Sequence, residues 1–180
     1  MKRINISLTT PGSIQKAIEE LQSYKFSLKT KAYTLVDRLL AIGIRVAEEN
    51  SGEYKGLIFY EPFISNEFDC VGFLIAQDKQ KIVREWYRGG QLVSAEVSPL
   101  LMAEFGSGWF AEVLFALSGV GQGTFPGQIH AFDENGWTWT TKDGVRHYSM
   151  GETPTHPMHN ASMALINNVV EVAREVFGNG

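Results

Sequence analysis

The chain has 180 residues, of which 44% are hydrophobic and 20% charged, a balance that indicates one folded domain over residues 1–180 and excludes wholesale disorder. Its formal net charge of -4 argues against a dedicated nucleic-acid-binding protein, because such proteins usually carry a basic excess. A single cysteine excludes an intramolecular disulfide and a four-cysteine zinc site, and no apolar run approaches the roughly 18 residues of a membrane span, so we expect the protein to be made and folded in the cytosol.

The first third of the sequence is predicted to be a short strand followed by helix. Apolar residues alternate over residues 4–8, as in a strand, and Thr10-Pro11 then provides a helix start. Helical spacing runs through residues 13–22, weakens near residues 24–27, and resumes in a long helix from Leu28 to Ala47. This helix either lies across a sheet or also meets its neighbour in an oligomer.

The middle of the chain is predicted to contain paired strands and one short helix. Apolar and aromatic runs at residues 56–63 and 70–78 are typical of two paired strands, with Cys70 packed as a small buried group. Residues 79–97 are expected to continue the sheet, with a turn at Gly89-Gly90. Ser98 and Pro99 then predict the cap and first turn of a helix over residues 99–105, which ends at Gly106.

The last third is predicted to be a hairpin and a helix. Residues 137–150 place two tryptophans on one strand face and supply a turn at Asp143-Gly144, and residues 155–177 have helical periodicity. The expected fold is therefore α+β: a mostly antiparallel sheet covered by a long helix in the N-terminal half and by a C-terminal helix. An extended glycine-rich loop and a protruding hairpin complete this prediction.

Catalytic, metal and cofactor sites are not evident. The glycines at 119, 121, 123 and 127 are not followed by the lysine, hydroxyl and helix start of a phosphate-binding loop. His156 and His159 lie three residues apart, but Pro157 separates them and no acidic third ligand has a usual spacing. Glu104 and Glu112 could form a hydrolase pair, and the two tryptophans could stack a sugar. We expect no metal, cofactor or small-molecule substrate, and no enzymatic activity.

Charge is sparse between residues 89 and 132, where the charged residues are Glu96, Glu104 and Glu112 and where leucine, phenylalanine and tryptophan accumulate. An irregular segment is difficult to bury within its own domain, because its backbone polar groups would lose their partners. Charge depletion with aromatic enrichment is typical of the centre of a protein–protein interface. Part of this region is therefore predicted to contact other subunits.

Two segments resemble a known family. SPLLMAEFGSG, residues 98–108, is similar to the A-x-x-V-E-F-G-T-G motif of the gene-product-ten-like tail-component proteins of tailed bacteriophages. Residues 121–161 resemble the later part of that family, where a glycine-rich stretch and an aromatic hairpin lead to P-x-x-P-F-M-x-x-A, here PTHPMHNA at residues 154–161. Ser107 stands where the family usually has threonine, and Met158 follows Pro157 without the usual phenylalanine.

The resemblance implies a structural virion protein without catalytic residues or cofactor. Members of the family form rings, most often sixfold, that complete the tail or join it to the head while DNA passes through the lumen. The implied partners are further copies of the chain and the adjacent head–tail connector and tail-tube proteins, with no membrane involved. The implied location is the neck or upper tail of the virion, after synthesis in the host cytoplasm.

The predicted interface follows from this resemblance and from the sparse charge. Residues 104–108 are expected to make a tight turn in which Gly106 and Gly108 permit a positive φ or a close backbone approach. That turn would direct residues 109–128 and the hairpin toward a neighbouring subunit. The candidate interface residues are Glu104, Phe105, Gly106, Gly108, Trp109, Phe110, Phe115, Gly121, Gly123, Phe125, Pro126, Trp137, Trp139, Pro154, Pro157 and Met158.

Two alternatives stay open at this point. The first is a small soluble hydrolase or carbohydrate-binding protein that uses Glu104, Glu112, Trp137 and Trp139. The second is a cytosolic interaction domain with no viral role.

Overall fold

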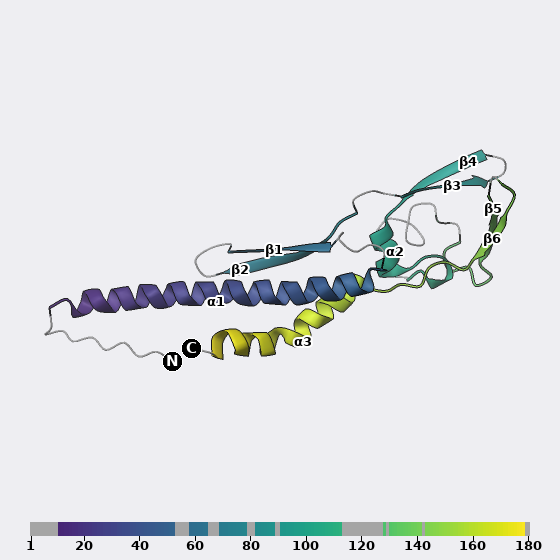
Figure 1. Ribbon diagram of the computed structural model, residues 1–180. Coiled ribbons are helices and arrows are strands. Elements are labelled where there is room, and N and C mark those ends of the chain that lie inside the picture. Colours follow the sequence, from purple (N-terminus) through teal and green to yellow (C-terminus); the bar gives the residue numbers. More distant parts are fainter. Residues whose placement is uncertain are drawn as a thin grey trace.

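The structure is a computed structural model that describes residues 11–52, 58–64, 69–78, 82–88, 91–112, 128, 130–141 and 143–178. It is an α+β chain of elongated shape, with a long helix at one end and two hairpins at the other (Figure 1). The helices are α1 (Ser13–Asn50), α2 (Pro99–Phe105) and α3 (Pro157–Gly178), with a short 3-10 turn, η2 (Gly108–Phe110). The strands are β1 (Ile58–Ile64), β2 (Cys70–Ala76), β3 (Ile82–Arg88), β4 (Gln91–Val97), β5 (Trp137–Thr140) and β6 (Arg146–Ser149).

Helix α1 is continuous over 38 residues, which corresponds to a length of about 57 Å. The predicted weak interval at residues 24–27 does not interrupt it, because the segment contains no glycine or proline and a helix extends at little cost once formed. The alternating three- and four-residue spacing in fact passes through the interval, with Lys25 at the position where an apolar residue is missing. The helix is capped by Gly12 rather than Thr10, and the strand predicted at residues 4–8 lies outside the described residues.

The core lies where the C-terminal half of α1 meets α3 and the β1–β2 hairpin (Figure 1). Its buried centre is formed by Ala47, Ile58, Leu100 and Ala161. A Cβ on Gly43 would lie 3.1 Å from Leu165 and 3.2 Å from Leu74, so glycine allows helix and hairpin to approach α1 closely at this point. The predicted long helix and C-terminal helix are both confirmed, and their contact forms the main body of the fold.

The strands form three separate antiparallel pairs, β1–β2, β3–β4 and β5–β6, in the part of the chain that the structure describes. The hairpins at residues 58–76, 82–97 and 137–149 were predicted, but the single sheet covered by helices was not correct for these residues. The reason is physical: alternation within a segment predicts a strand, but only tertiary packing decides which strands join. Here α1 and α3 pack directly on each other, and each described strand has one strand partner.

Two side chains of the β1–β2 hairpin, Cys70 and Tyr60, have raised pKa values. Cys70 is half-buried on β2, where its thiol donates to the Phe63 carbonyl (3.4 Å) and burial raises its pKa. Cys70 was predicted to be a small buried group, and this is correct only in part, because the residue is half-buried. On β1, the Asp37 carboxylate of α1 raises the pKa of Tyr60, since an ionised phenol would be repelled by that charge.

Candidate functional site: the Glu104–Gly108 turn

The short helix α2 positions the motif at residues 104–108. The Ser98 hydroxyl oxygen accepts a hydrogen bond from the Leu101 N–H (3.1 Å), and Pro99 occupies the first turn, where a missing N–H has no cost. The helix ends at Gly106, whose N–H donates to the Met102 carbonyl (2.8 Å). The predicted cap, start and end of α2 are all confirmed.

The turn that follows α2 depends on glycine at two positions. Gly106 and Gly108 have φ values of +68° and +62°, a region that residues with a Cβ rarely adopt. A Cβ on Gly106 would lie 2.6 Å from the Phe110 carbonyl oxygen and 2.7 Å from Pro154. The predicted tight turn with positive φ at both glycines is therefore confirmed.

Hydrogen bonds join this turn to the segment that leads into α3 and to Phe132. The buried Ser107 donates its N–H to the Glu152 carbonyl (2.9 Å), and its hydroxyl oxygen accepts from the Glu152 N–H (3.0 Å). The Trp109 N–H donates to the Met150 carbonyl (2.8 Å), and the Phe132 N–H donates to the Gly108 carbonyl (2.9 Å). A threonine at position 107 would supply the same hydroxyl oxygen, so serine retains the polar contact.

Glu104 closes the arrangement by capping α3. Its two carboxylate oxygens accept hydrogen bonds from the Met158 N–H (2.7 Å) and the His159 N–H (2.9 Å). These are unpaired donors of the first helical turn, where negative charge also interacts favourably with the helix dipole. Pro157, at the first helical position, has no N–H to satisfy and is buried. The two motifs, about fifty residues apart in sequence, are thus parts of one structural junction.

The sixteen predicted interface residues differ in exposure. Trp109, Phe110 and Trp139 have exposed side chains, whereas Phe105, Trp137, Pro154 and Met158 are half-buried. The junction residues Gly106, Gly108 and Pro157 are buried within the chain, and Glu104 is engaged by α3. Phe115, Gly121, Gly123, Phe125 and Pro126 lie outside the described residues, as does most of the predicted extended loop.

Two of the described histidines lie beside carboxylates. Glu112 Oε1 lies 3.4 Å from His156 Nε2, and Asp133 Oδ2 lies 3.3 Å from His130 Nδ1. Within the described ranges, no three histidine, cysteine, aspartate or glutamate residues are grouped so that they could hold a metal ion. Both glutamates of the candidate hydrolase pair therefore have partners within the fold.

The two tryptophans of the β5–β6 hairpin are stacked on histidines. Trp137 stacks on His130 with ring centroids 5.0 Å apart, and Trp139 stacks on His147 at 5.1 Å. One face of each ring is therefore already occupied by a side chain of the same chain. Trp139 remains exposed and Trp137 is half-buried, so they do not form an open pair of aromatic faces.

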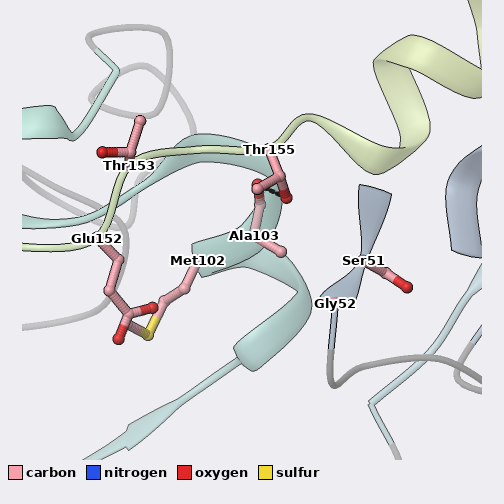
Figure 2. Close-up of a pocket in the computed structure, with 7 residues that line it drawn as sticks. All are labelled: Ser51, Gly52, Met102, Ala103, Glu152, Thr153 and Thr155. Atoms are coloured by element: carbon pink, nitrogen blue, oxygen red, sulfur yellow. Dashed lines mark hydrogen bonds between the residues drawn. The ribbon is translucent and has the colours of Figure 1, made fainter. Parts of the chain in front are cut away.

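A small depression lies beside the junction, between the end of α1, α2 and the residues that precede α3 (Figure 2). Its volume is about 190 Å³, below the roughly 300 Å³ at which small-molecule sites usually begin. Two of its hydroxyl groups are used within the chain: Ser51 donates to the Glu48 carbonyl (3.0 Å) and Thr155 to the Ala103 carbonyl (3.3 Å). The depression therefore does not have the character of a substrate site.

No family model matches the chain, and neither curated proteins nor solved structures match it. Among the described residues, no helix is both long enough and apolar enough to cross a membrane.

Proposed function

We propose that the chain is a structural virion protein of a tailed bacteriophage. In this proposal it forms a closed ring of identical subunits in the neck or upper tail, completes the tail and joins it to the head, and lets DNA pass through the lumen. Its partners are other copies of itself and the adjacent connector and tail-tube proteins. It acts without a cofactor and without catalysis.

The observation that carries the proposal is the large apolar surface of an elongated chain. Among the described residues, 23 large hydrophobic side chains are exposed, whereas twelve hydrophobic residues are buried. Large apolar side chains are exposed along α1, on the hairpins, at η2 and along α3. Apolar surface on this scale marks contact with other proteins, and assembly would remove it from water.

The geometry of the Glu104–Gly108 turn adds support. The residues that carry the family resemblance interlock through hydrogen bonds, glycine conformations and a helix cap. Such a junction fixes α3 and the 109–112 segment relative to each other, which is a structural rather than a chemical use of these residues. Trp109 and Phe110 follow directly from it with exposed rings.

The hydrolase alternative is weaker on the same observations. A glycosidase needs one carboxylic acid and one carboxylate free to reach a substrate. Both oxygens of Glu104 instead accept backbone hydrogen bonds from α3, and Glu112 faces His156. A sugar platform is weakened in the same way, because each tryptophan already stacks on a histidine.

A nonsense mutation in the gene of the encoding phage tests the proposal. We expect lysates with filled heads and with tails that remain unjoined, because the ring that connects them is missing. Adding purified wild-type protein should restore joined particles and plaque formation. The proposal fails if infectious particles of normal appearance form without the chain.

A further inference from the structure

An Asn-Gly dipeptide, Asn135-Gly136, lies in a turn directly before β5. In this dipeptide the main-chain nitrogen of the second residue attacks the side-chain amide of the first more readily than in others, because glycine has no Cβ to hinder the approach. Asn135 is exposed, so water reaches its side-chain amide. The proposed function uses neither residue, and the dipeptide is therefore considered for its own chemistry.

Hydrogen bonds hold the main chain of this turn on both sides of the asparagine. The Gly136 N–H donates to the Asp133 carbonyl (3.1 Å), which is the hydrogen bond of a β-turn with Asn135 at its third position. The Asn135 N–H donates to the Asp133 carboxylate (3.1 Å). The Asn135 carbonyl accepts from the Tyr148 hydroxyl of β6 (3.1 Å), so the turn is also tied to the hairpin.

These contacts keep the reacting atoms apart. Asn135 is not among the described residues with positive φ, which indicates a type I turn, where ψ at the third position is about 0°. Ring closure requires rotation about the Asn135 Cα–C bond until the Gly136 nitrogen faces the side-chain carbon Cγ. That rotation moves the Gly136 N–H away from Asp133 and the Asn135 carbonyl away from Tyr148. The turn therefore has to open before the reaction can occur.

The reaction in the opened turn needs water as its co-reactant and no oxidant or reductant. The Gly136 nitrogen attacks Cγ of Asn135, the bond between Cγ and Nδ2 breaks, and ammonia leaves with the proton that the Gly136 nitrogen loses. Water then hydrolyses the resulting five-membered succinimide. Attack at one of its carbonyl carbons gives aspartate, and attack at the other gives isoaspartate, in which the main chain passes through the side-chain carbon.

Conversion would disturb a closely packed point of the fold. A Cβ on Gly136 would lie 2.4 Å from the Ser149 carbonyl oxygen and 2.8 Å from the Tyr148 hydroxyl, so the chain has little room to shift there. Isoaspartate lengthens the main chain by one carbon at this point and moves Gly136 out of its place. Either product also adds a negative charge next to Asp133 and Glu134.

We propose that Asn135 is a site of spontaneous deamidation, that opening of the turn at residues 133–136 limits its rate, and that conversion to isoaspartate leaves the turn permanently open. The inference does not depend on the proposed function, since it concerns one turn of the free chain. It places a one-way chemical change at the base of the β5–β6 hairpin, which carries two of the predicted interface residues.

Timed incubation of the full chain at mildly alkaline pH, followed by peptide mass spectrometry, tests this inference. We expect Tyr148→Phe to accelerate conversion at Asn135 roughly two- to tenfold, the factor that corresponds to one lost hydrogen bond, and unfolding in urea to accelerate it further. Thr138→Val is the matched control and should leave the rate unchanged, because it removes an exposed hydroxyl that accepts from Arg146 (3.4 Å) on the same hairpin. The second Asn-Gly dipeptide, Asn179-Gly180, is the internal reference, whose rate neither variant should change.

Each part of the inference has a result that would overturn it. Absence of conversion at Asn135 while Asn179 is converted would show that Asn135 is not a modification site. Equal rates at Asn135 in the wild type and Tyr148→Phe, or in the folded and the urea-unfolded chain, would show that the turn does not limit the reaction. Hydrogen exchange of the isoaspartate form should find the Gly136 N–H unprotected, and retained protection would show that conversion does not open the turn.

Discussion

Replacing Gly106 with alanine is expected to lower the free energy of unfolding by roughly 3–5 kcal/mol, the largest single-residue effect that we predict. Gly106 has φ +68° and ψ -172°, a conformation adopted almost exclusively by glycine. The added Cβ would also lie 2.6 Å, 2.7 Å and 2.8 Å from the Phe110 carbonyl oxygen, Pro154 and the Glu152 carbonyl oxygen. Two of these atoms belong to the backbone and cannot rotate away. Urea unfolding followed by circular dichroism gives the change.

Gly52→Ala is the matched control for backbone conformation alone. Gly52 has φ +58°, but a Cβ there would meet no atom within 4 Å. We expect a loss of about 1 kcal/mol, which is the cost of a left-handed alanine without a clash. Equal losses at the two positions would contradict the close approach at the Glu104–Gly108 turn.

Replacing Glu104 with alanine is expected to cost about 1–3 kcal/mol, because two backbone donors of α3 lose their acceptors at once. The Met158 N–H is half-buried and is the harder of the two for water to satisfy. Glu104→Gln should lose less, since the amide oxygen can still accept one of these hydrogen bonds. Native-state hydrogen exchange should show the loss as faster exchange in the first turn of α3.

Glu112→Ala serves as the control for removing a neighbouring carboxylate. Glu112 faces His156 at 3.4 Å, and both side chains are about a third exposed. A solvent-accessible pair of this kind contributes little to stability, and we expect the free energy of unfolding to change by at most about 1 kcal/mol. If Glu112→Ala proved as destabilising as Glu104→Ala, the helix cap would not be the reason that Glu104 matters.

Local elements were predictable from the sequence where local rules decide them. Ser98, Pro99 and Gly106 each act within one helical turn, so the bounds of α2 follow from capping chemistry alone. The Asp143-Gly144 turn joins the predicted strands of the β5–β6 hairpin in the same way, with Gly144 at φ +82°. The continuity of α1 was not predicted. Lys25 occupies one position of the regular three- and four-residue spacing, so a pattern based on apolar residues alone has a gap there.

The junction between the two motifs could not be derived in this way. The hydrogen bonds from Met158 and His159 to Glu104 join residues more than fifty positions apart, and no local pattern specifies such a pair. A signal was nevertheless present in the sequence. One motif contains an acidic residue and the other begins a helix at Pro157, and a carboxylate can cap the free N–H groups of a helix start. The separation of the hairpins depends likewise on tertiary packing, which alternation within each strand does not encode.

A reconstruction of the neck of the encoding phage from electron cryomicroscopy images tests the central claim most directly. We predict a closed ring of copies of this chain between the head and the tail tube, with the DNA path open along its axis. A neck whose density accounts for every component without this chain would contradict the account.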